Sequence, residues 1–249
     1  MLYAAVIATG LAVLGSTIGV NLGGLLRARL ELLVHVATGA LLGITAFDIL
    51  PEAKAVLSWP VFLVAAASGY ALLWIIGRFV FYVCPSCAIT HVHESDLARK
   101  GSLILLGVAL GVHCLLDGMA IATGSELSHR AEIGALLGVA LHKVPEGLAL
   151  GLLLIGARYS RRNALAIATG IEAITIVGAL AGTLVAQMPG QTGVGLVFAV
   201  VGGSFVYLVF NALGGAFEHS GQVPRVRSLT AELASFLATG LLLWAATRM

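Results

Sequence analysis

The chain has 249 residues, of which 59% are hydrophobic and only 10% are charged, and its mean hydropathy is +1.02. Such a composition lies far outside the range of soluble domains and predicts an integral membrane protein. A formal net charge of +2 is too small to indicate a nucleic-acid-binding protein, and three cysteines provide no disulfide framework.

Polar residues divide the chain into eight apolar segments. Each has roughly the 20 residues that a helix needs to cross the hydrocarbon core of a bilayer. The first has no basic leader before it, so we expect a retained span rather than a cleaved signal peptide. We therefore predict an all-α integral membrane protein, an eight-transmembrane-helix bundle that forms a single transmembrane domain over residues 1–249. The predicted spans are 2–24, 31–50, 60–82, 101–124, 132–157, 163–187, 192–215 and 228–247.

Lysine and arginine are enriched in the cytoplasmic loops of membrane proteins, so their distribution predicts the orientation. Nine such residues lie in the loops after the odd-numbered spans, and three lie on the opposite side. The nine are Arg27, Arg29, Arg99, Lys100, Arg158, Arg161, Arg162, Arg225 and Arg227, and the three are Lys54, Arg130 and Arg248. This bias predicts that both termini lie outside the cytoplasm.

Acidic residues close the second predicted span on its outer side. Asp48 and Glu52 are one helical turn apart, and such a pair would gather cations at an entrance. The alternative for Glu52 is an ordinary helix end with an interfacial acid, whereas Asp48 lies deeper and favours a functional role. His35, near the cytoplasmic start of the same span, is expected to make a polar contact between helices.

The predicted cytoplasmic loop 83–100 combines two cysteines with two histidines, namely Cys84, Cys87, His91 and His93. These residue types are zinc ligands, and Cys-x-x-Cys is a common half-site, although the spacing is not that of a known zinc finger. Thiols stay reduced in the cytoplasm. We favour a loop that captures or senses metal, with a reactive redox pair or a polar linker as the alternatives.

The fourth and fifth spans carry two versions of one phrase, His113-Cys114-Leu115-Leu116-Asp117-Gly118 and His142-Lys143-Val144-Pro145-Glu146-Gly147. In each phrase a histidine stacks against a carboxylate one turn away on the same helix face. Both histidines lie about twelve residues into their span, roughly 18 Å deep and near the middle of a core about 30 Å thick. Two buried carboxylates repel each other unless they are protonated or neutralised, and a divalent metal would neutralise them. Pairs that only tie helices together are the less favoured alternative, because the two copies match in depth.

The two phrases resemble the signature of the ZIP (Zrt/Irt-like) family of divalent metal transporters, prokaryotic type. Helices 4 and 5 of that family carry His-Asn-x-x-Glu-Gly-like and His/Gln-acid-x-x-Glu-Gly-like motifs, and the number and spacing of its spans agree with this chain. The Leu-Pro-Glu ending of the second span, at 50–52, is similar as well. The resemblance implies a midmembrane metal site between helices 4 and 5, with the ligands His113, Asp117, His142 and Glu146.

Two residues depart from the family pattern: Cys114 stands where asparagine is common, and Lys143 stands where an acid is common. The resemblance also places Glu172, in the sixth span, at the position of a second metal site. A buried acid needs a cation or a proton, and Lys143 is its expected partner, in place of a second metal. Glu218 and His219, near the cytoplasmic end of the seventh span, form either an exit relay or an ordinary helix end.

These features predict a transporter that moves divalent transition-metal ions towards the cytoplasm. Mixed imidazole and carboxylate ligands favour zinc, followed by iron(II), manganese, cobalt and cadmium, over magnesium and calcium, which prefer oxygen ligands. The metal would enter past Asp48 and Glu52, bind at the central site and leave towards the histidine loop. Because protonation of the ligands opposes metal binding, we expect the affinity to fall at acidic pH.

We expect no enzymatic activity and no catalytic residue. One alternative is an intramembrane metalloenzyme, but the chain lacks His-Glu-x-x-His and has no serine or cysteine arranged with an obvious base. The other is a proton-coupled solute carrier that uses Lys143 and Glu172 as a charge pair. The expected partners are the zinc ion as transported substrate, the lipid membrane and, by resemblance, a second copy of the chain in a homodimer. The expected location is a bacterial inner membrane.

Overall fold

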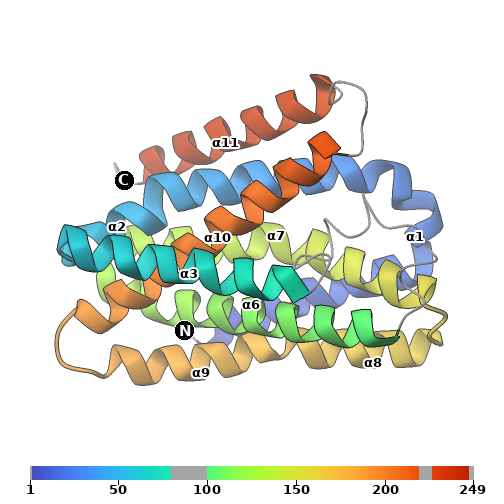
Figure 1. Ribbon diagram of the computed structural model, residues 1–249, viewed down its shortest axis with the longest axis horizontal. Helices are drawn as coiled ribbons and strands as arrows, with labels where there is room; N and C mark the ends of the chain where they lie inside the picture. Colours follow the sequence, from blue (N-terminus) through green and yellow to red (C-terminus); the bar gives the residue numbers. More distant parts are fainter. Residues whose placement is uncertain (1, 80–99, 219–225, 247–249) are drawn as a thin grey trace.

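The computed structural model describes residues 2–79, 100–218 and 226–246, and every described element is a helix (Figure 1). The long helices run side by side, with α8 and α9 along one side of the bundle and α11 along the opposite side. The elements are α1 (Leu2–Ile44), the π-helical segment η1 (Thr45–Ile49), α2 (Leu50–Val56), α3 (Trp59–Phe79), α6 (Lys100–Leu127), α7 (His129–Gly156), α8 (Arg161–Glu172), α9 (Ile174–Ala186), α10 (Thr192–Glu218) and α11 (Val226–Ala246).

Seven helical stretches in the described part of the chain are long and apolar enough to cross a membrane, and a shorter apolar helix follows at Leu229–Ala245. The seven are Leu2–Leu22, Leu32–Val56, Trp59–Arg78, Leu103–Leu127, His129–Gly156, Arg161–Ala186 and Thr192–Ala212. The predicted fold class, an all-α integral membrane bundle of eight spanning helices, is confirmed.

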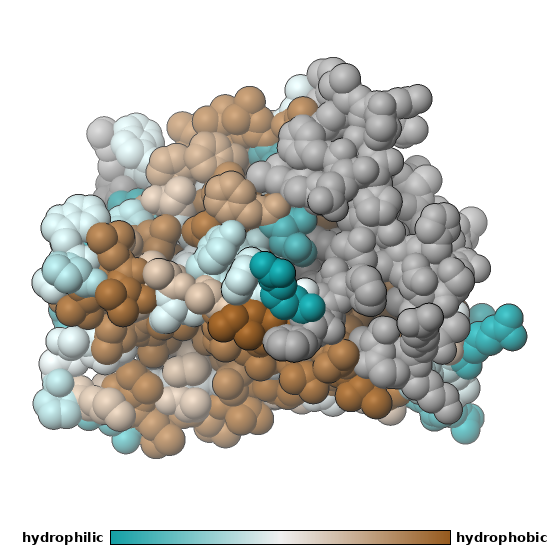
Figure 2. All heavy atoms as spheres, in the orientation of Figure 1, coloured by the Kyte–Doolittle hydropathy of each residue, from teal (hydrophilic) through white to brown (hydrophobic). Residues whose placement is uncertain are grey.

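The surface of the bundle is largely apolar, as lipid contact requires. Figure 2 shows apolar side chains over much of the described face. Val64, Ile104 and Leu241 are at least 65% exposed. Contiguous apolar surface of this kind is rare on soluble monomers and is typical of a face that contacts lipid or another protein.

The first two spans belong to one continuous helix, α1, although the sequence predicted a break at 25–30. Ile18 and Val34 both pack around Leu148 of α7. In a straight helix they would be about 24 Å apart, so α1 must bend back on itself, as Figure 1 shows. The backbone stays helical through the bend because residues 25–30 are leucine, arginine and alanine, which are strong helix formers.

The second span also extends beyond its predicted end at residue 50, through η1 and α2 to Val56. Pro51 does not end it, because the first turn of a helix tolerates the missing N–H of a proline. The π-helical turn of η1 contains Asp48 and buries it. Such turns are frequent at functional sites.

The sixth span, predicted as one helix over 163–187, is broken after Glu172. Helix α8 ends there, α9 begins at Ile174, and the N–H of Ile176 donates to the carbonyl of Ala173 at 3.0 Å in a tight turn. The break leaves the carbonyl of Glu172 free to accept a hydrogen bond from Thr9 Oγ1 at 3.4 Å. It therefore fixes Glu172, which is fully buried, at the middle of this span.

The last helix, α11, is attached to the second half of α1 by a buried polar pair. His35 Nδ1 lies 3.1 Å from Glu232 Oε2, and both residues are less than 10% exposed. The polar interhelical contact predicted for His35 is confirmed, with a partner that is 197 residues away in the sequence.

Small residues let α7 approach the first half of α1 at backbone distance. A Cβ atom on Gly15 would lie 2.2 Å from the carbonyl oxygen of Val144, and one on Gly147 would lie 1.9 Å from that of Ala12. Ser16 Oγ donates to the Gly147 carbonyl at 3.0 Å in the same contact. This packing fixes α7 against the first half of α1 close to the two turns of α7 that carry His142 and Glu146.

Gly15→Ala is therefore expected to lower the melting temperature of the protein in detergent, because a backbone carbonyl cannot move aside. Overpacking costs about 1–3 kcal/mol of unfolding free energy. The control is Gly10→Ala on the same helix, where an added Cβ meets nothing within 4 Å. Alanine is a better helix former than glycine, so this control is expected to be neutral or slightly stabilising. Equal melting temperatures for the two variants would contradict the close contact.

Candidate metal centre

Helices α6 and α7 bring the two polar phrases face to face. His113 and Asp117 project from consecutive turns of α6, and His142 and Glu146 project from consecutive turns of α7. All four side chains are buried, with exposed fractions of 7% or less. One ligand atom from each lies within 4.8 Å of the others. The two phrases therefore converge on one point inside the bundle.

The spacing of these atoms suits a small divalent ion. His113 Nε2 lies 3.1 Å from Glu146 Oε2 and 3.5 Å from Asp117 Oδ2, and His142 Nε2 lies 3.3 Å from Asp117 Oδ2. Zinc bonds to nitrogen and oxygen of 2.0–2.2 Å give a tetrahedron whose edges are about 3.4 Å long. The described distances are close to those edges.

The backbone of α7 orients His142 for metal binding. Its Nδ1 lies 2.6 Å from the carbonyl oxygen of Gly138, one turn earlier. A carbonyl oxygen carries no proton, so Nδ1 must donate, and the lone pair of a neutral ring is then on Nε2. That atom faces Asp117 and the centre of the cluster, as expected of a metal-ligating histidine held by its other nitrogen.

Lys143 lies beside the four-residue cluster and is itself completely buried. Its Nζ is 2.6 Å from Glu146 Oε1, 3.0 Å from Glu172 Oε2 and 3.1 Å from Asp117 Oδ2. The predicted pairing of Lys143 with Glu172 is confirmed, and the lysine also contacts two residues of the first cluster. Cys114 Sγ completes its surroundings at 3.1 Å.

The contacts of Lys143 coincide with a second group of metal-ligand types. Cys114, Glu146 and Glu172 are buried and offer ligand atoms within 4.8 Å of one another. The ammonium group lies within hydrogen-bond distance of all three. A protein cation thus lies among the ligand types of this second group.

The formal charges balance for one divalent ion. With Asp117, Glu146 and Glu172 counted as ionised and Lys143 as protonated, the buried site has a formal charge of −2. Isolated buried charge is costly, so a net charge this large needs compensation. One divalent cation supplies it, whereas two would leave the site positive.

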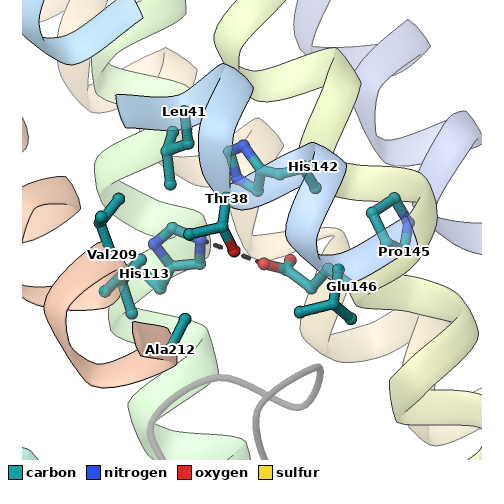
Figure 3. A pocket seen from close by; sticks show the side chains of 11 residues that line it. Thr38, Leu41, His113, His142, Pro145, Glu146, Val209 and Ala212 are labelled. Carbon is teal, nitrogen blue, oxygen red and sulfur yellow. Dashed lines mark ion pairs between the residues drawn. The ribbon is translucent and has the colours of Figure 1, made fainter. Parts of the chain in front are cut away.

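A cavity of about 40 Å³ opens beside the cluster (Figure 3). His113, His142 and Glu146 form one wall, and α1 and α10 form the other, including Thr38, Leu41, Val209 and Ala212. This volume exceeds the roughly 10–15 Å³ that a cavity needs to hold one water molecule. The cavity lies between the cluster and the face where the second half of α1 meets α10.

The two predicted entrance residues differ in their surroundings. Asp48 is fully buried, and its Oδ1 lies 3.2 Å from Nε of Arg130, in the first turn of α7. Glu52 in α2 is only partly buried. From the sequence, Arg130 was expected to be a loop charge, and the pair was not predicted because no local pattern connects residues that are far apart in the chain. The position of Arg130 next to the apolar run of the fifth span was the one sequence signal that could have indicated a buried partner.

Several predicted residues lie outside the part of the chain that the structure describes. These are Cys84, Cys87, His91, His93 and His219, together with the side chain of Glu218. Their roles remain predictions.

A comparison with protein families matches residues 87–243 to the model of the ZIP zinc transporters, which is more than half of the chain. The chain belongs to the ZIP family. The matched region contains α6 to α10 and most of α11, and with them both histidines and all three carboxylates of the centre. A comparison with curated proteins gave no match.

Membership of the ZIP family identifies the chain as a divalent metal transporter. The buried cluster of two histidines and two carboxylates fits a metal site within such a transporter. This ZIP protein has a lysine inside the centre. In the family pattern quoted above, an acid is common at that position, and here it is replaced by the cation that contacts the other acids.

Proposed function

We propose that the protein carries zinc across a membrane towards the cytoplasm, with His113, Asp117, His142 and Glu146 as the metal ligands. The observation that carries this proposal is the buried convergence of these four side chains within 4.8 Å. Two neutral imidazoles and two carboxylates form a neutral complex with a divalent ion. Neutrality lowers the cost of holding the ion in the middle of a bilayer.

The donor set favours zinc among the divalent ions. Imidazole suits zinc, iron, nickel and copper, whereas magnesium and calcium prefer shells made of oxygen alone. The distances between donor atoms of 3.1–3.5 Å also suit a tetrahedral ion better than a larger calcium ion. Iron(II), manganese, cobalt and cadmium are the expected secondary substrates.

We further propose that the centre holds one metal ion at a time. Lys143 supplies the positive charge that a second ion would otherwise bring to Cys114, Glu146 and Glu172. An ammonium group cannot leave its helix, so this charge remains when the transported ion departs. The lysine would therefore compensate part of the negative charge of Asp117, Glu146 and Glu172 throughout transport.

The predicted orientation of the chain supports uptake into the cytoplasm. The distribution of lysine and arginine predicts that residues 34 and 212 lie in the cytoplasmic half, and the cavity beside the cluster is lined by Val34 and Ala212. Asp48 and Glu52 then lie at the outer entrance. The cytoplasmic exit would include Glu218 and His219 and the residues Cys84, Cys87, His91 and His93. We place the protein in a bacterial inner membrane as one transmembrane domain and as a homodimer, with both termini outside the cytoplasm.

The test is ion flux into proteoliposomes that contain the purified protein and a fluorescent zinc indicator. Zinc and cadmium are expected to enter much faster than in empty liposomes, whereas magnesium is not. Uptake must proceed without any reaction of a second substrate. A protein that binds zinc tightly but moves none would contradict transport and favour the metalloenzyme alternative.

A further inference from the structure

The second half of α1, continued by η1, lies along one face of α7 from the outer surface to the metal centre. The side chain of Asp48 packs against Gly134, where an added Cβ would meet its Oδ2. One turn deeper, Ile44 packs against Gly138 in the same way. One turn deeper again, Leu41 and His142 line the cavity. These contacts form a continuous seam between the two helices.

The seam is closed above the metal centre, and the cavity lies beside the centre below it. Ile44 is completely buried, and its contact with Gly138 lies between the Asp48 contact with Gly134 and the cavity-lining residues Leu41 and His142. Arg130 covers Asp48 from the outside: its Nε lies 3.2 Å from Asp48 Oδ1, and its Nη2 donates to the carbonyl oxygen of Phe47. The Arg130 side chain is 36% exposed, whereas that of Asp48 is 0% exposed. The arginine therefore reaches from the surface to the outermost buried carboxylate of the seam.

The carboxylate of Asp48 is incompletely satisfied. Among the described residues, neither of its buried oxygens accepts a hydrogen bond, although Oδ1 lies within ion-pair distance of Arg130 Nε. A buried charged oxygen without a partner is costly, and it retains the capacity to bind a cation. A divalent ion and the guanidinium group would compete for this carboxylate, since both need the same oxygens.

We propose that Arg130 is a tethered cation that closes the outer route by pairing with Asp48, and that an entering metal ion must displace it. This inference rests on the proposed function for the identity of the ion. The closed state and the metal-bound state then differ in one exchange. The guanidinium group leaves the carboxylate for water, and the metal ion takes its place at the carboxylate. Breaking the pair without supplying a metal opens the seam more often.

The first test measures closure and needs no transport. Ile44→Cys, in a background with Cys84→Ser and Cys87→Ser, reports whether a charged, membrane-impermeant thiol reagent added outside intact cells passes below the pair. Arg130→Gln is expected to raise the labelling rate about fivefold, the upper end for a partly exposed ion pair. Ala135→Cys, at a buried position of α7 between Gly134 and Gly138, is a second reporter in case the first variant folds poorly. His129→Gln, an exposed neighbour in the same turn, is the matched control and is expected to change nothing.

The second test separates the roles of the two partners through zinc uptake at low zinc concentrations. Arg130→Gln removes the competitor and is expected to lower the half-saturating zinc concentration severalfold. Asp48→Asn removes the carboxylate that receives the metal and is expected to raise it severalfold, although it breaks the same pair. A pair that merely held α7 to η1 would shift both variants in the same direction, and that result would overturn the proposal.

An unchanged labelling rate in Arg130→Gln with both reporters would also overturn it. Increased labelling in a protein that moves no zinc would support the closure of the seam by Arg130 and would count against the proposed function. The two failures are thus distinguishable.

Discussion

His142→Ala is expected to reduce zinc uptake into proteoliposomes by about 100-fold or more. The substitution removes one of four converging donors and leaves the three carboxylates and Lys143 in place. Loss of residues that only orient metal ligands already costs 10–100-fold in affinity, so loss of a ligand should cost at least as much. The variant should also weaken equilibrium zinc binding by a similar factor.

The structure offers close controls for this prediction on the same helix. His129→Ala removes a histidine that is largely exposed at the start of α7 and far from the cluster. Glu132→Gln removes a neighbouring acid of the same first turn. Both variants are expected to transport zinc like the wild type. If His142→Ala kept near-normal uptake, the four-residue centre could not be the site through which the metal passes.

The convergence of the two polar phrases was predictable because it depends on local geometry. Residues four apart lie on one helix face, and a shared depth in two consecutive spans brings two such faces to one level. The pairing of Lys143 with Glu172 followed from charge alone, since a buried acid must find a cation. The sequence did not show that the same ammonium also contacts Asp117 and Glu146. That contact depends on the side-chain path of a lysine, which no pattern of residue types specifies.

Features that depend on distant parts of the chain were not predicted. The partners Asp48 and Arg130 come from different spans, and the pair forms only because α1 and α7 pack through glycines at Gly134 and Gly138. The break at Ala173 has neither proline nor a strong turn signal. The apolar segment 163–187 was therefore predicted as one span. The π-helical turn at η1 shifts Asp48 relative to a regular helix, and periodicity does not anticipate such a turn.

Lys143→Ala is expected to convert the centre from one metal ion to two. The variant removes the cation that contacts all three acids and frees Cys114, Glu146 and Glu172, whose ligand atoms lie within 4.8 Å of one another. Three buried negative charges then remain, and a second zinc ion is the compensation that this donor set favours. Elemental analysis after equilibrium dialysis should give about two zinc ions per chain instead of one.

The same variant should become strongly dependent on metal for its stability. Removing one partner of a buried ion pair costs about 3–5 kcal/mol, because the remaining charges lose their compensation. In the presence of a chelator, the melting temperature of Lys143→Ala should therefore fall well below that of the wild type. Saturating zinc should restore most of the difference, because ligands that bind the folded state stabilise it.

A second substitution tests whether charge or packing causes these effects. Adding Glu172→Gln to Lys143→Ala removes one acid and one ligand of the new site, so the double variant should return to one zinc ion per chain. Its metal-free melting temperature should also recover in part, because two negative charges remain instead of three. Lys54→Ala, which removes a lysine outside the centre, should keep one zinc ion. One zinc ion and an unchanged melting temperature in Lys143→Ala would show that the ammonium does not take the place of a second metal.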